Sequence, residues 1–251
     1  MGFIENKLIE EFRQREAFSR EELFDFYKKF EPDLKEGTLG WRIYNLKSKN
    51  ILRSVQRGYY TLLNKTNYKP ESTKDLLRLA KFISTKFEST QYCIWTTVWI
   101  NEFSQHQSTK ELIIIETEKE MVESMYYELK DAFQFNFFVN PDKRTIDYYL
   151  SEIDKAVVVK KMITRSPLNS RKDSKKDYFI PSLEKILVDL YSEKHLFYFY
   201  QGAELLSIYS SAIKHYSINY TTLFSYAKRR DKAAEIKQFL ETNFKHLTIK
   251  F

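Results

Sequence analysis

The residue types that build most catalytic and metal sites are scarce in this chain of 251 residues. Its single cysteine, Cys93, excludes an internal disulfide and a zinc site made of several thiolates, so we expect a reducing, cytoplasmic environment. Neither a Walker pattern nor GxGxxG can be drawn from the five glycines, which excludes the two phosphate-binding loops that use them. The four histidines lie far apart and lack zinc-ligand spacing. We therefore expect no catalytic residue, no cofactor and no metal, and predict that the protein is not an enzyme.

Long apolar runs are also missing, since none approaches the ~18 residues of a membrane span. We therefore expect a soluble protein with no membrane partner. Lysine and arginine number 41 against 34 acidic residues, a net charge of +7 that fits a nucleic-acid partner but also many ordinary basic proteins. With 43% hydrophobic residues, the chain can bury a small core and a larger one.

The stretch from Lys35 to Leu63 carries the strongest local pattern. Leu39, Ile43 and Leu46 recur at helical spacing, which predicts a helix with one face on a core. From Lys35 to Lys65 there are seven basic residues and one acid, Glu36, a local balance of 7 − 1 = +6. The face opposite the core is predicted to carry four polar or basic residues: Thr38, Arg42, Asn45 and Lys49.

A hairpin is predicted directly after this helix. The helix should begin near Thr38 and end at Asn50, a residue that tolerates the left-handed conformation. ILRSVQ and YYTLL then alternate apolar and polar residues on either side of Arg57 and Gly58. A helix followed by a two-stranded ribbon is typical of the second half of a winged helix-turn-helix.

Two helices are expected before this pair. Apolar residues at intervals of three and four predict the first over Ile4 to Arg15. Ser19 with Glu22 three residues later forms a capping-box pattern that starts the second, and Pro32 ends it. The short connection that follows indicates a helix-turn-helix, so we predict an N-terminal winged helix-turn-helix domain over residues 1–66.

Beyond a polar segment, residues 73–251 are predicted to form a mixed α/β domain that ends in helices, so the fold class is α+β. Residues 166–177 are polar and basic, which predicts a flexible surface loop. One helix is expected to run from His195 to Tyr216, and HLTIKF at the end resembles a strand. In the central part, helices are predicted over 73–88, 96–103, 118–133 and 145–150, and strands over 91–95, 112–117, 135–139 and 156–163.

Taken together, this layout resembles a known family. An RGYY wing turn, a central mixed sheet, IPSLEKILVDLY and SYAKRRDKAAEIKQFL are similar to the AbiEi-type antitoxins and transcriptional regulators of abortive-infection systems. The resemblance implies a DNA-binding repressor of its own operon that counteracts a cognate nucleotidyltransferase-like toxin. Asn50 stands where the family usually has a glycine, and TTVWINEFSQH lacks a glycine expected there.

Seven residues are assigned to double-stranded DNA, at an operator of the protein's own gene. Three of them, Thr38, Arg42 and Asn45, are placed where side chains of a recognition helix reach base edges. The others suit phosphate contacts: Lys35, Lys49, Arg53 and Arg57. Trp41 is expected to pack rather than to stack on DNA.

Two alternatives stay open. The same basic face could make the winged helix a protein-docking adaptor. A metal-dependent nuclease would need Glu116 and Glu118, at the end of the LIIIET strand, to hold Mg²⁺ with Lys119 nearby. Glu118 also suits the first turn of the following helix, where an acid complements the helix dipole.

Overall fold

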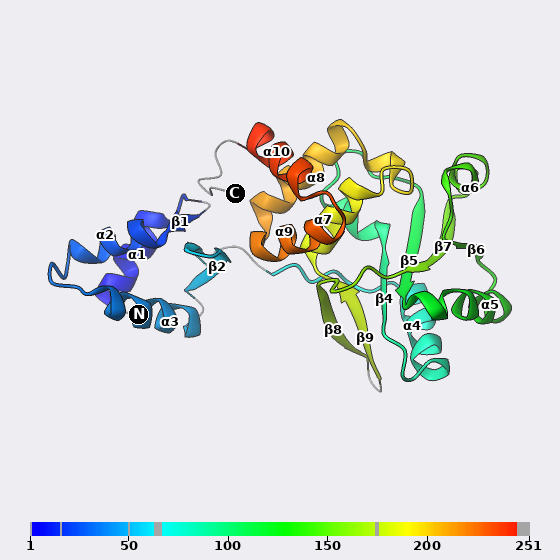
Figure 1. Ribbon diagram of the computed structural model, residues 1–251, viewed down its shortest axis with the longest axis horizontal. Coiled ribbons are helices and arrows are strands. Elements are labelled where there is room, and N and C mark those ends of the chain that lie inside the picture. Colours follow the sequence, from blue (N-terminus) through cyan, green and yellow to red (C-terminus); the bar gives the residue numbers. More distant parts are fainter. Residues whose placement is uncertain (1, 16, 50, 63–66, 174–175, 245–251) are drawn as a thin grey trace.

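The computed structural model describes residues 2–15, 17–49, 51–62, 67–173 and 176–244. It is a mixed α+β structure, as predicted. Figure 1 shows three N-terminal helices at one end of the long axis and a mixed sheet with its helices toward the other. Within the described residues, no helix is both long enough and apolar enough to span a bilayer.

The N-terminal part follows the predicted order, with one additional strand. Helices α1 and α2 precede α3, and Ser19 caps α2 through its hydroxyl while Glu22 binds the Ser19 backbone, so the capping box is confirmed. The hairpin turns at Gly58, whose φ of +78° favours glycine. The bounds are α1 Phe3–Phe12, β1 Phe18–Ser19, α2 Arg20–Lys28, α3 Glu36–Ser48, β2 Leu52–Gln56 and β3 Tyr59–Leu62.

These strands form an antiparallel sheet in the order β1-β3-β2, with Phe18 opposite Tyr60 and Leu52 opposite Leu62. Helix α3 begins at Glu36, with Lys35 as its N-cap, rather than near Thr38. Lys35 makes no side-chain hydrogen bond to the first turn, so no capping side chain marks the start of this helix in the sequence. Asn50, the predicted end, lies outside the described residues.

The larger part is built on a four-stranded sheet in the order β4-β5-β7-β6. β4 is antiparallel to β5, while β7 is parallel to both β5 and β6. Ile114 and Val158 pair in neighbouring strands and are fully buried, as the continuous apolar runs predict. Helix α4 packs on β4 and α5 on β6 and β7. The bounds are α4 Lys74–Lys86, β4 Tyr92–Thr96, η1 Thr97–Glu102, β5 Glu111–Thr117, η2 Lys119–Met121, α5 Val122–Ala132, β6 Asn136–Val139, α6 Lys143–Tyr148, η3 Leu150–Glu152 and β7 Lys155–Lys161.

The prediction of a flexible loop over residues 166–177 was wrong. β8, Leu168–Asp173, pairs antiparallel with β9, Lys176–Pro181, and β9 lies against β4. The hairpin forms because Tyr178 and Ile180 of β9 are buried, whereas the polar residues of β8 gave no strand signal in the sequence.

The described elements after β9 are helical, and Figure 1 shows these helices above the β8–β9 hairpin. The single helix predicted from His195 to Tyr216 is divided, because Gly202 adopts a φ of +64° between a 3-10 turn and α8. The closing strand predicted over 246–251 lies outside the described residues. The bounds are α7 Leu183–Ser192, η4 Tyr198–Tyr200, α8 Ala203–His215, α9 Tyr220–Arg229 and α10 Ala233–Asn243.

Two hydrophobic clusters hold these elements. The smaller is built by residues between Leu8 and Leu62, and the larger chiefly by residues between Leu76 and Phe244. Val55 of β2 belongs to the larger cluster, and β2 packs against α9. The hairpin is therefore attached to the larger part as well as to α3.

Candidate nucleic-acid interface

Helix α3 has one buried face and one uncovered face. Leu39, Ile43 and Leu46 are buried in the smaller cluster. The opposite side is formed by Trp41 and Tyr44, which are 63% and 67% exposed. Because successive residues are ~100° apart on a helix, these two aromatic side chains lie at the centre of the outward face and Ser48 continues it. The prediction that Trp41 packs in the protein was wrong.

Arg42 lies at the margin of that face, where it is held by the protein itself. Its guanidinium donates two hydrogen bonds to the Glu31 carboxylate, at 2.7 and 2.6 Å, and lies 5.2 Å from the centre of the Tyr27 ring. Only 30% of the Arg42 side chain is exposed. Asn45 is also half-buried. Arg42, expected on the outer face, is therefore paired with Glu31, which lies in the connection between α2 and α3.

Two other predicted phosphate contacts also have partners within the protein. Lys49 Nζ lies 2.5 Å from Glu5 Oε1, and this hydrogen bond lowers the pKa of Glu5. Arg53 donates a hydrogen bond to Asn67 Oδ1 and lines a cavity against the larger part of the chain. Both cations are therefore partly neutralised or directed away from the outward face of α3.

The remaining assigned residues are more accessible. Lys35, Thr38 and Arg57 are exposed, and neither cation makes an ion pair within the described ranges. Lys35 lies at the N-terminal end of α3 and Arg57 at the tip of the hairpin. The structure therefore leaves one exposed cation at the N-terminal end of α3 and another at the tip of the hairpin.

Lys47 supports this surface from the side. Its ammonium donates to Ser54 Oγ at 2.6 Å and lies 5.1 Å from the centre of the Tyr60 ring. These contacts join the C-terminal half of α3 to both strands of the hairpin. The helix and the hairpin are thus held in a fixed relation by a side chain as well as by the core.

The carboxylates considered for a nuclease site do not face one another. Glu116 is 1% exposed and accepts a hydrogen bond from Lys185 Nζ at 2.7 Å. Glu118 is exposed beyond the end of β5 and lines a cavity of about 460 Å³ with Lys119 and Lys161. No group of three or more potential metal ligands from histidine, cysteine, aspartate and glutamate occurs in the part of the chain that the structure describes.

Glu116 instead belongs to a buried ionic cluster around Lys185. Lys185 Nζ lies 2.7 Å from Glu116 and 2.5 Å from Asp189, and Tyr226 donates to Asp189 at 2.9 Å. Burial alone would lower the pKa of Lys185, but the charges of Asp189 and Glu116 raise it well above its ordinary value. Burial alone would raise the pKa of Asp189, but the charge of Lys185 lowers it below its ordinary value. The cluster therefore keeps opposite charges ionised inside the core.

The position of the aromatic centre could have been found from the sequence. The phase set by Leu39, Ile43 and Leu46 places Trp41 and Tyr44 opposite the core. The ion pair of Arg42 could not be found in this way, because Glu31 belongs to another element. The helical phase is local information, whereas the partner of each cation is not.

A comparison with known families matches residues 38–246 to the family described as DUF6577, a family of unknown function. The match covers more than half of the chain, and the protein therefore belongs to this family. It includes α3 from Thr38 onward and the hairpin, so it crosses the boundary predicted between residues 66 and 73. No curated protein matches the chain.

Proposed function

We propose that residues 3–62 form a winged helix-turn-helix unit that binds double-stranded DNA, and that the protein regulates transcription from its own operator. The order α1-β1-α2-α3-β2-β3 with the sheet order β1-β3-β2 supports this proposal. Helix α3 follows a short connection after α2, as a recognition helix does. The observation that carries the proposal is the uncovered face of α3, with Lys35 at one end and Arg57 on the adjoining hairpin.

The proposed contacts differ from a purely basic recognition face. Trp41 and Tyr44 would enter the major groove first, where aromatic side chains can contact thymine methyl groups and sugars. Thr38 lies beside them and offers a hydroxyl to a base or phosphate. Lys35 and Arg57 would bind phosphates. Arg42 would reach a base only after leaving Glu31.

We also propose that the protein acts as an antitoxin, because its sequence resembles AbiEi-type proteins. In that role the protein would counteract a nucleotidyltransferase-like toxin encoded beside it. The test is to express the neighbouring open reading frame alone, which should arrest growth, and then together with this protein, which should restore growth. Failure to restore growth would reject this part and leave DNA binding as a separate proposal.

DNA binding is tested with two double-variant proteins. Fluorescence anisotropy would compare a duplex from the protein's own upstream region with an unrelated duplex of equal length, over a range of salt concentrations. Trp41→Ala with Tyr44→Ala should reduce the preference for the upstream duplex, because base contacts carry specificity. Lys35→Ala with Arg57→Ala should weaken binding to both duplexes and reduce the salt slope by about 1 for each lost phosphate contact.

Matched controls come from exposed residues far from α3. Tyr148 and Tyr149 are 72% and 65% exposed at the end of α6, so Tyr148→Ala with Tyr149→Ala removes two aromatic side chains without touching the proposed interface. This control should bind both duplexes like the unchanged protein. If the unchanged protein binds neither duplex at low salt, the proposal is wrong.

The exposure of Trp41 and Tyr44 also favours a second candidate, a protein-docking adaptor. Aromatic residues are enriched at protein interfaces, whereas lysine is depleted there. An adaptor would lose its protein partner with Trp41→Ala and Tyr44→Ala, and keep it with Lys35→Ala and Arg57→Ala. The two double variants therefore distinguish the two candidates.

A further inference from the structure

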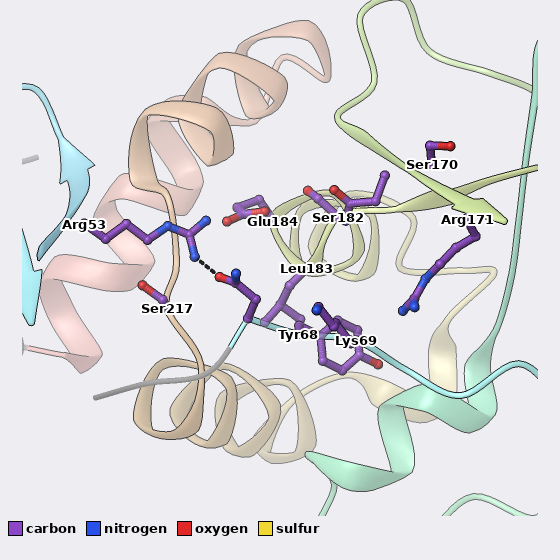
Figure 2. A pocket seen from close by; sticks show the side chains of 11 residues that line it. Arg53, Tyr68, Lys69, Ser170, Arg171, Ser182, Leu183, Glu184 and Ser217 are labelled. Atoms are coloured by element: carbon purple, nitrogen blue, oxygen red, sulfur yellow. Dashed lines mark hydrogen bonds between the residues drawn. The ribbon is translucent and has the colours of Figure 1, made fainter. Parts of the chain in front are cut away.

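A polar cavity lies where the hairpin meets the larger part of the chain. It has a volume of about 450 Å³, within the range of small-ligand sites. Figure 2 shows Arg53 reaching into it from β2 and Arg171 from β8, with the first turn of α7 between them. The walls are formed by Arg53, Asn67, Tyr68, Lys69, Asn169, Ser170, Arg171, Ser182, Leu183, Glu184 and Ser217.

Positive charge is in excess on these walls. Arg53, Lys69 and Arg171 come from three separate segments, against a single acidic residue, Glu184. Glu184 Oε1 already accepts a hydrogen bond from the backbone N–H of Asn219 at 2.8 Å, and the side chain is buried. The cations therefore face the cavity without an equal number of carboxylates.

The two guanidinium groups keep donors available. Arg171 Nη2 donates one hydrogen bond to the carbonyl of Pro70, at 3.2 Å, and Arg53 donates one to Asn67 Oδ1. Each guanidinium has five N–H donors in a planar fork, which matches the oxygens of a phosphate. Lys69 is exposed and makes no ion pair within the residues that the structure describes.

The first turn of α7 adds neutral donors. Ser182 is its N-cap, and the N–H groups of Leu183 and Glu184 precede the first intrahelical hydrogen bonds. The N-terminus of a helix favours an anion through its dipole and its unpaired N–H groups.

Ser217 adds a buried hydroxyl group to the wall of the cavity. It is only 7% exposed, yet its Oγ has no hydrogen-bond partner. A buried hydroxyl without a partner costs free energy, so such groups normally find one. Ser217 lines the cavity opposite Arg171 in Figure 2.

We propose that this cavity binds a small phosphate-bearing molecule, with Arg53, Lys69 and Arg171 as cationic ligands and the first turn of α7 as the neutral one. The site joins β2 to β8 and α7, so occupancy would tie the hairpin to the larger part of the chain. This proposal does not depend on DNA binding, because its ligand is a small anion.

Isothermal titration calorimetry with sodium pyrophosphate, at constant ionic strength, tests the site in the full-length protein. Lys69→Gln with Arg171→Gln should weaken pyrophosphate binding at least tenfold. Lys172→Gln is the matched control, because Lys172 is the exposed neighbour of Arg171 on β8 and does not line the cavity. It should bind like the unchanged protein.

Three results would overturn the proposal. The first is that the unchanged protein gives no heat of binding with millimolar pyrophosphate. The second is that Lys172→Gln weakens pyrophosphate binding as much as the double variant does. The third is that the unchanged protein does not bind pyrophosphate while the double variant loses binding to duplex DNA. The last result would assign the cavity to a nucleic-acid backbone. Should the double variant fail to fold by circular dichroism, Arg53→Gln tests the opposite wall with the same expected weakening.

Discussion

At the scale of single residues, the buried charges around Lys185 have the largest expected effect on stability. Lys185 is fully buried between Glu116 and Asp189. Arg230 and Lys160 extend the cluster through Glu193, so the positive and negative groups alternate. A buried ion pair contributes little net stability compared with apolar packing, but removing one partner leaves the other charge unpaired.

Lys185→Met should therefore destabilise the protein by about 3–5 kcal/mol at about pH 7. Removing Lys185 removes the charge that holds the pKa of Asp189 low, so the Asp189 carboxylate becomes easier to protonate in the folded variant. The difference in stability from the unchanged protein should then shrink between about pH 7 and about pH 5. Urea unfolding at both pH values measures it.

The control is Lys237→Met, because Lys237 forms only an exposed pair with Glu241, at 3.8 Å. Its stability should change by less than about 0.5 kcal/mol at either pH. A similar small change for Lys185→Met would contradict the proposed role of the cluster. In the unchanged protein, the lowered pKa of Asp189 stabilises the fold above the ordinary carboxyl range, and that stability is lost as the pH falls.

At the scale of elements, the N-terminal helices depend on their ends as well as on their apolar faces. Helix α2 is short and begins with a reciprocal cap, in which Ser19 Oγ accepts from the Glu22 N–H at 3.1 Å and Glu22 accepts from the Ser19 N–H at 2.7 Å. A helix of this length gains little from propensity alone. The cap therefore helps to place α2, and with it Glu31 and the orientation of α3.

Ser19→Ala should lower the stability by about 1 kcal/mol, because it leaves a backbone donor of the first turn without its partner. Thermal unfolding followed by circular dichroism would show the change. Ser210→Ala, in the exposed middle of α8, is the control and should be neutral or slightly stabilising. Equal effects of the two substitutions would argue against the cap.

At the scale of the whole molecule, the two hydrophobic clusters are joined rather than separate. Val55 of β2 belongs to the larger cluster and β2 packs against α9. The connection after the hairpin is also anchored, since the Tyr68 ring packs against Phe103 and Tyr216, and Trp99 Nε1 donates to the Glu71 carbonyl at 2.7 Å. The division into domains at 1–66 and 73–251 stays a prediction, and these contacts would couple the two parts.

Val55→Asp should uncouple the unfolding of the two parts, because it places a charge where β2 is buried. In a Trp41→Phe background, tryptophan fluorescence reports Trp95 and Trp99 of the larger cluster, while circular dichroism reports helices of both parts. The two urea transitions should coincide before the Val55 change and separate after it. Separate transitions before the change would mean that the coupling is absent.

The elements and their apolar faces could be predicted from the sequence, since they depend on local spacing. The capping box at Ser19, the hairpin around Gly58 and the continuous apolar strand β5 were all predicted and confirmed. The phase of Leu39, Ile43 and Leu46 even determines that Trp41 faces outward, although aromatic residues usually pack.

Only the tertiary structure decided which cations remain available on the surface. Arg42 is paired with Glu31, in the connection after α2, and Lys49 with Glu5 of α1. Arg53 faces a cavity closed by α7. Polar β8 likewise became a strand because β9 supplied the buried residues of the hairpin. Local periodicity fixes the direction of a side chain from its own element, but the charge it meets there is set by chain segments far away in the sequence.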